Sequence, residues 1–214
     1  MLRLLIALAL CTLGPAAAFA HPHVFVDARE EIVFDPQGRM TAIRHIWQFD
    51  EAFTAFAVQG LDANGDGKLS DAELQPLAKV NVDSLKDYAY FTLLKVDGHH
   101  VPVDFPTEYW LDFHESRLTL FYTLPIRKPI APGKQTTLEV FDPEYFVAFD
   151  FVKDHAITLN GAPPNCKAGY RPPHELDEKT MAMLAAIPAD QHDLPENLAD
   201  AASSLASLIS VKCS

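Results

Sequence analysis

Short strand-like stretches, separated by proline and glycine, recur along most of this 214-residue sequence and restrict its fold more than any other feature. The first stretch, 23–34, alternates apolar and polar side chains. A turn at 35–38 leads into a second stretch, 40–49, and together they predict a β-hairpin. Further stretches of this kind follow at 88–96, 101–105, 109–113, 118–124, 136–141, 145–152 and 156–159. Short strands joined by such turns favour an antiparallel sheet or sandwich over a parallel sheet.

Segments with apolar residues at helical spacing interrupt and follow the strands. Helices are predicted over 50–60 and 71–87, and, after a proline-rich stretch that begins at residue 163, around 178–186 and 197–211. We therefore predict an α+β fold, mainly an antiparallel β sheet or sandwich. Its predicted parts are a cleaved leader at 1–20, a β-rich domain at 21–162 with an EF-hand helix-loop-helix inserted at about 50–87, and a tail at 163–214 that is proline-rich and then helical.

The loop between the first two helices has the pattern of an EF-hand calcium site. Its residues, 62–73, carry side-chain oxygens at positions one, three and five, a glycine at position six and a glutamate at position twelve. This spacing gathers oxygens from one short loop around a hard cation. The predicted Ca²⁺ ligands are the side chains of Asp62, Asn64, Asp66 and Glu73, the backbone carbonyl of Lys68, and Ser70 through a water molecule. The alternative is a polar turn that binds nothing.

The surroundings of this loop predict how it is used. The sequence holds no partner EF-hand, so we expect a modest calcium affinity and a structural role rather than that of a sensor. Leu69, at position eight, is predicted to point inward and pack. Pro76 falls within the outgoing helix, where it lacks the N–H for a helical hydrogen bond, and a kink or a restart of the helix is expected there.

The first residues have the character of a secretory signal peptide. A positive charge at Arg3 precedes an apolar run over 4–13, and the small-residue pattern at 18–20 predicts cleavage before His21. The apolar run is shorter than the roughly 20 residues that a membrane-spanning helix needs. We therefore expect an exported, periplasmic protein.

Charge and cysteine usage fit that compartment. The formal net charge of -12 at pH 7 makes nucleic acid a poor partner and cations good ones, because an acidic surface repels phosphate. Cys11 leaves with the signal peptide, so Cys166 and Cys213 remain. We predict a disulfide between them, since disulfides persist in an oxidising compartment. The alternative is two buried free thiols.

Histidines at the predicted mature amino-terminus form a candidate transition-metal site. Cleavage would free the amine of His21, and His23 lies two residues further on the same strand face. Residues that pair across the hairpin are expected to sum to about 73, which sets His23 near Asp50 and Glu51. Neutral imidazole suits zinc, copper and nickel. Pro22 excludes the square-planar site that uses the backbone nitrogen of the second residue.

Other histidines are further candidate ligands. They are His45, the pair His99 and His100, and His114. Solvated histidine is the alternative, above all for the pair, which lies in a predicted turn. The sequence holds no tight metal motif such as His-Glu-x-x-His or a pair of Cys-x-x-Cys.

Four motifs together carry a family resemblance. They are HPHVFVD directly after the signal peptide, IWQFDEAF, the loop LDANGDGKLSDAELQPLAKVN, and FDPEYFVAF. With these motifs, most of residues 21–160 resembles a bacterial family of unknown function whose members are described as the periplasmic component of an uncharacterised ABC-type transport system. Proteins that look like this are often encoded with nickel/cobalt-type permeases, which implies a role in handling a transition metal. No catalytic residues come with the resemblance.

The favoured functional hypothesis is a periplasmic accessory protein that captures zinc, nickel, cobalt or copper or presents it to an inner-membrane permease, with Ca²⁺ holding the fold. A second hypothesis is a copper-dependent redox enzyme that uses the amino-terminal histidine. A third is a calcium-stabilised adhesion or assembly module. No nucleophile motif of the Gly-x-Ser-x-Gly type and no phosphate loop is present, so the sequence favours binding over catalysis.

Overall fold

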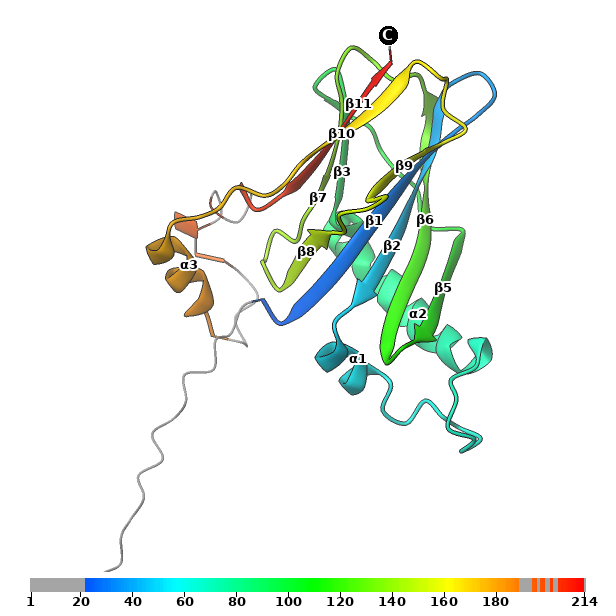
Figure 1. Cartoon of the computed structure of the whole chain (residues 1–214), viewed down its shortest axis with the longest axis vertical. Helices are drawn as coiled ribbons and strands as arrows, with labels where there is room; N and C mark the ends of the chain where they lie inside the picture. The colour runs from blue at the N-terminus through cyan, green and yellow to red at the C-terminus, as the bar shows by residue number, and fades with distance from the viewer. Residues whose placement is uncertain (1–21, 189–193, 196, 199–200, 202–203, 214) are drawn as a thin grey trace, which may run out of the picture.

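Two mostly antiparallel sheets form the body of the protein (Figure 1). The computed structural model describes residues 22–188, 194–195, 197–198, 201 and 204–213, so the predicted signal peptide and His21 lie outside it. The first sheet has the strand order β5-β6-β2-β1-β8, and β9 also pairs with β1. Its strands are β1 (Val24–Phe34), β2 (Met40–Phe49), β5 (Glu108–His114), β6 (Arg117–Ile130), β8 (Val147–Phe151) and β9 (Ile157–Asn160).

The second sheet and the helices complete the predicted α+β class, which is confirmed. The second sheet has the order β10-β11-β7-β3-β4. Its strands are β3 (Thr92–Val96), β4 (His99–His100), β7 (Thr136–Val140), β10 (Cys166–Arg171) and β11 (Ser207–Cys213). The helical elements are α1 (Glu51–Ala57), α2 (Asp71–Leu85), the 3₁₀ segment η1 (Lys86–Phe91) and α3 (Glu178–Ala185). Within the described residues, no helix is both long and apolar enough to span a membrane.

The hairpin of β1 and β2 is confirmed, but its register differs from the prediction. Val26 pairs with Phe49, so paired residue numbers sum to 75 rather than 73. The turn is longer than the predicted four residues, because the Asp35 N–H donates to the Arg39 carbonyl at 2.9 Å. A register shift between Val33 and Phe34 adds a further offset. Each residue added to the turn, and each register shift, changes which residue of β2 lies opposite a given residue of β1.

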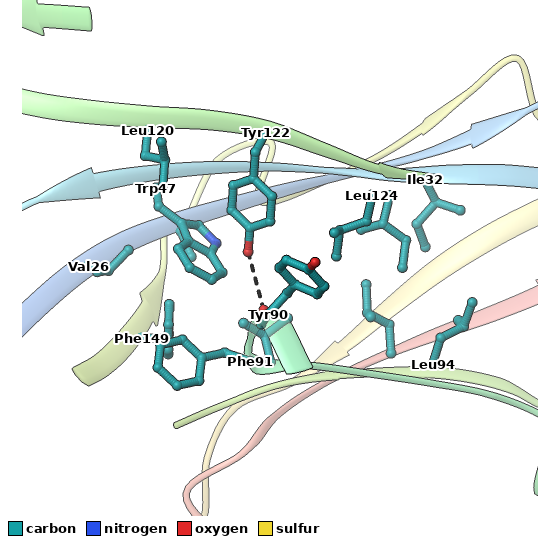
Figure 2. Packing of buried hydrophobic residues seen from close by; sticks show 14 of the residues in the cluster. Val26, Ile32, Trp47, Tyr90, Phe91, Leu94, Leu120, Tyr122, Leu124 and Phe149 are labelled. Atoms are coloured by element: carbon teal, nitrogen blue, oxygen red, sulfur yellow. Dashed lines mark hydrogen bonds between the residues drawn. The ribbon is translucent and has the colours of Figure 1, made fainter. Parts of the chain in front are cut away.

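The hydrophobic core lies between the facing sheets (Figure 2). Alternate residues of β1 and β2 point into it, as the period of two along a strand requires. Trp47, Tyr122 and Leu94 are among its fully buried side chains. The aromatic rings pack edge to face, with the centroids of Trp47 and Tyr122 5.0 Å apart.

Helix α2 covers the first sheet beside β5 and runs without a break past Pro76. Leu74, Ala78 and Val82, four residues apart, are its buried face. Pro76 lies on the exposed side, where the ring meets solvent and the lost helical hydrogen bond is tolerated. The expected restart of the helix is therefore wrong.

The carboxyl-terminal segment forms part of the second sheet. Helix α3 confirms one predicted tail helix, but the helix predicted over 197–211 is wrong from residue 207 on, where β11 begins. In β11, Ser207, Ile209 and Val211 are buried in alternation, which is the period of a strand. β11 pairs with both β7 and β10, so its backbone hydrogen bonds are met by strands from two other parts of the chain.

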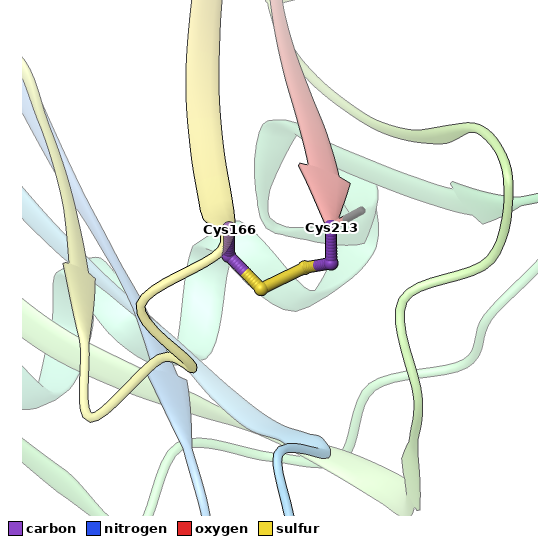
Figure 3. The surroundings of a disulfide bond; sticks show 2 residues. All are labelled: Cys166 and Cys213. Atoms are coloured by element: carbon purple, nitrogen blue, oxygen red, sulfur yellow. A yellow bond between two sulfur atoms is a disulfide. The ribbon is translucent and has the colours of Figure 1, made fainter.

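The predicted disulfide between Cys166 and Cys213 is confirmed (Figure 3). The two cysteines lie directly opposite each other in the β10–β11 ladder. The bond therefore fastens the last strand to the sheet at the point where the chain would otherwise fray.

We expect that the Cys166→Ala/Cys213→Ala double variant loses about 2 to 4 kcal/mol of unfolding free energy, because the crosslink restricts the unfolded chain. Urea unfolding of the variant and of the oxidised wild type measures the difference. Reduced wild type is the control and should match the variant. Equal stability of all three forms would show that strand pairing alone holds β11.

Candidate metal sites

The loop 62–73 is folded by its own polar side chains. Asp62 accepts hydrogen bonds from the Gly65 N–H at 2.7 Å and, through its other oxygen, from the Gly67 N–H at 2.9 Å. Asn64 accepts from the Asp66 N–H at 2.8 Å. These side chains turn back over the loop because short polar side chains bond to nearby backbone donors in tight turns.

Glu73 closes the loop at its other end. One carboxylate oxygen accepts from the Ala63 N–H at 2.9 Å, and the other accepts from the N–H of Ser70 at 2.9 Å and from its hydroxyl at 2.7 Å. Ser70 is also the N-cap of α2, so the pair forms a capping box. The hydrogen bonds from Ser70, followed by those from the loop backbone, hold the pKa of Glu73 below its usual value. The carboxylate is therefore ionised at neutral pH.

The predicted calcium ligands thus lie on one loop between two helices, and Leu69 packs against the core as predicted. In this arrangement the carboxylates of the loop are directed at backbone N–H groups. No three histidine, cysteine, aspartate or glutamate side chains of the described residues are grouped so that they could hold a metal ion. The calcium site stays a prediction, and so do the roles of Lys68 and Ser70 as ligands.

The residues proposed for the transition-metal site have other contacts. Asp50 is the N-cap of α1 and accepts from the Phe53 N–H, while its second oxygen accepts from the Phe25 N–H, each at 2.8 Å. The Asp50 N–H in turn donates to the Phe25 carbonyl, so Phe25, and not His23, lies across from it. Glu51 is exposed in the first turn of α1.

His23 sits at the start of β1 and is held by a different segment. The backbone N–H of His23 donates to the Phe146 carbonyl at 2.9 Å. The centroids of the His23 and Phe146 rings lie 4.8 Å apart. The side chain is exposed. Because His21 lies outside the described residues, the joint site of the two histidines stays a prediction.

His45, which the sequence offered as a further ligand, belongs to a buried polar cluster. Its Nδ1 lies 2.7 Å from an oxygen of Glu30, and both side chains are fully buried. The other oxygen of Glu30 accepts from the indole N–H of Trp47 at 3.2 Å. The second ring nitrogen of His45 lies 3.2 Å from the Thr92 hydroxyl, and the ring of Tyr122 stacks on His45 at 4.5 Å.

This cluster supports a strained turn at the end of η1. Ala89, Tyr90 and Phe91 have φ angles of 50°, 57° and 51°, in a region that residues with a side chain rarely adopt. The Tyr90 carbonyl accepts from the hydroxyl of Thr92 at 2.7 Å and from that of Tyr122 at 3.3 Å. Burial, with a contribution from the Glu30 carboxylate, raises the pKa of Tyr122 well above its usual value, so its hydroxyl stays a donor.

The class of fold is defined by two sheets, a helix-loop-helix and a last strand that is crosslinked by a disulfide. Comparison with known proteins places the chain in a family. The chain belongs to the family described as protein of unknown function DUF1007, whose model matches residues 6–213. The match includes residues 163–213, which the motif resemblance had left out. β10 and β11 therefore lie within the part of the chain that the family model matches.

Two relatives share parts of the sequence. An uncharacterised protein of Haemophilus influenzae is 22% identical over 183 residues, which are 84% of this chain and 85% of that protein. An uncharacterised 15.5 kDa protein of Spirochaeta aurantia is 30% identical over 98 residues, which are 46% of this chain and 70% of that protein.

Removal of either member of the Glu30–His45 pair should destabilise the protein by about 3 to 5 kcal/mol, because a polar group is left buried without its partner. We expect Glu30→Ala and His45→Ala each to show this loss in urea unfolding. The double variant should lose less than the sum of the two single losses. Additive losses would contradict a direct interaction between the two side chains.

Proposed function

We propose that this protein is a periplasmic metal-binding accessory protein, the soluble partner of a transport system. In this proposal the loop 62–73 binds Ca²⁺ as a structural ion, and the amino-terminal histidines take up zinc, nickel, cobalt or copper for an inner-membrane permease. The observation that carries the proposal is the complete EF-hand pattern in a loop that joins two capped helices.

Calcium in the loop would fix two helices that contact neighbouring strands of the first sheet. The hydroxyl of Thr54 on α1 accepts from the Leu118 N–H of β6 at 3.1 Å. Helix α2 packs on β5, the next strand of the same sheet. An ion bound between Asp62 and Glu73 would join the two ends of the loop and so hold these contacts together.

Ca²⁺ binding requires a rearrangement of only a few side chains. The Glu73 oxygens, which now accept from the loop backbone and from Ser70, would turn toward the cation, and its lowered pKa keeps the carboxylate charged for that role. The hydrogen bonds of Asp62 to Gly65 and Gly67 keep the loop tightly turned. The ion would then replace hydrogen bonds that are exposed to water.

The transport role has separate support. The disulfide Cys166–Cys213 fits an oxidising compartment. His23 is exposed at the start of β1, so its imidazole is accessible to a metal ion. The strongly acidic chain attracts divalent cations to its surface. The motif resemblance adds the link to permeases of nickel and cobalt.

Calcium should raise the melting temperature of the wild type by about 5 to 10 °C when its concentration is near a hundred times the dissociation constant. Glu73→Gln should lose most of this rise, because it removes one of the carboxylate oxygens that close the shell. Glu175→Gln is the matched control, since Glu175 is exposed in the segment before α3, which lies on the other side of the molecule from the loop (Figure 1). Thermal unfolding followed by circular dichroism, with calcium or with chelator, measures the effect. A calcium response that is the same in Glu73→Gln and in the wild type would contradict the site.

Zinc, nickel and copper titrations of the processed protein test the histidine site. We expect His21→Ala and His23→Ala each to weaken binding of the preferred metal by about tenfold or more, because each removes a ligand. His174→Ala is the control, since His174 is exposed and is not among the candidate ligands, and it should bind as the wild type does. Unchanged affinity in both amino-terminal variants would remove the transport hypothesis and leave the calcium site untouched.

A further inference from the structure

An apolar cleft opens beside the core at the carboxyl end of α2. Its volume is about 230 Å³. Trp47 and Phe91, both labelled in Figure 2, are among the residues that line it, and their ring centroids lie 6.3 Å apart. Two polar side chains, Asn81 and Ser84 of α2, lie at its edge. Apolar walls with a few polar groups are the usual make-up of a small-molecule site.

A second hollow of about 220 Å³ continues the cleft. The two share Tyr88 and Phe91 on one side and Phe146 and Val147 on the other. The groove therefore runs between the segment 88–91 and the loop 142–147, two segments that are far apart in the sequence. The volume of about 230 Å³ is many times the roughly 10 to 15 Å³ that a single water molecule needs on this measure, so the cleft has room for a short alkyl chain.

Both walls of the groove are strained and held in place. On one side, the segment 88–91 contains the three residues with positive φ, and the Phe91 carbonyl accepts from the Phe141 N–H at 3.1 Å. On the other side, Tyr145 has a φ of 57°. Such strain persists where the surroundings fix the backbone, and it is found at ligand clamps.

Asp142 is the group that fixes the second wall. It is buried, and its carboxylate accepts from the backbone N–H groups of Glu144, Phe146 and Val147, each at 2.9 Å. Walls that are already ordered reduce the entropy lost when a ligand binds. The backbone of this wall is therefore ordered before a ligand binds.

The charge around the groove selects among apolar ligands. Its charged lining residues are Asp142 and Glu144, and its lining contains no lysine or arginine. Glu144 is half-buried at this rim, while the chain as a whole carries a formal charge of -12. A carboxylate or phosphate head group would be repelled, whereas an ammonium group would be attracted.

We infer that the groove between the segment 88–91 and the loop 142–147 binds the alkyl chain of a small cationic amphiphile. The alkyl chain packs on Trp47 and Phe91, and the cationic head lies at the rim near Glu144. The lining of the groove contains none of the residues proposed as metal ligands, so the inference does not rest on the proposed function, although Phe146 in its wall also contacts the His23 ring.

Trp47 supplies a direct reporter for the test. The chain contains two tryptophans, and Trp110→Phe leaves Trp47 as the single one. Trp110 stacks on Phe121 at 4.8 Å, so phenylalanine preserves the ring contact. In this background, ω-bromooctyltrimethylammonium, used below its micelle concentration, should quench Trp47 emission in a saturable way, because bromine quenches indole on contact. The anionic match, ω-bromooctanoate, should bind about tenfold more weakly.

Matched variants locate the site. Ser84→Phe should fill the cleft and weaken the affinity for the cationic probe by about tenfold. Val80 lies one turn earlier on α2, is 61% exposed and does not line the cleft, so Val80→Phe should leave this affinity unchanged. Tyr88→Ala, which removes a shared wall residue, provides a second variant if Ser84→Phe does not fold. Glu144→Gln should weaken binding of the cation by about fivefold.

Two results would overturn the inference. One is the absence of saturable quenching by the cationic probe. The other is quenching that Ser84→Phe and Tyr88→Ala leave unchanged, or that the anionic probe produces equally well.

Discussion

The contact between Glu30 and His45 in the middle of the core is the interaction on which the rest of the structure depends. The two side chains enter from neighbouring strands of the hairpin and lie between the sheets, where no solvent reaches them. An apolar core tolerates such a pair only when its polar atoms have partners. Trp47 and Thr92 supply these partners, and Thr92 carries the chain of contacts onward to the Tyr90 carbonyl. One pair of buried polar groups therefore fixes both the hairpin and the strained turn across the core from it.

That turn links the core to the surface. The Thr92 hydroxyl donates to the Tyr90 carbonyl and so fixes the backbone of this turn. Tyr88 and Phe91, on either side of Tyr90, therefore line the groove in a fixed arrangement. Helix α2 joins this region to the loop 62–73, since it begins at the Ser70 cap and ends where the groove opens. The helix therefore connects the loop 62–73 with the groove.

Much of the fold follows from local patterns in the sequence. Apolar and polar residues that alternate with a period of two predict β1 and β2, and apolar residues at helical spacing predict α2. The two cysteines that remain after the signal peptide predict the disulfide. Among the predictions that were wrong, the hairpin register has a local cause and β11 has a non-local one. The hairpin register shifted because Arg39 belongs to the turn, and β11 formed because β7 and β10 offer it backbone partners. The alanine and serine residues before β11 favour a helix, so the alternation of buried and exposed residues within β11 is not recognisable from the sequence.

The candidate sites likewise divide into one that the sequence reveals and others that only the structure reveals. The loop 62–73 is recognisable because all its proposed ligands are close in sequence. The groove instead collects residues from β1, β2, β6, α1, α2, η1 and the segment 142–147. His45 could be found as a polar residue on the inner face of a strand, but a sequence alone does not distinguish a buried partner of Glu30 from a metal ligand. The distinction needs the second strand and its register.

The loop 142–147 joins two of the three proposed sites. It forms one wall of the groove, and through the Phe146 carbonyl it also holds the start of β1, where His23 is exposed. Asp142 orders this loop by accepting three backbone N–H groups, so one buried carboxylate sets the position of both. The acidity of the chain then acts in the same direction at every site. A calcium ion, a divalent transition metal and a cationic head group are all ligands that such a field attracts, and anions are the class that it keeps away.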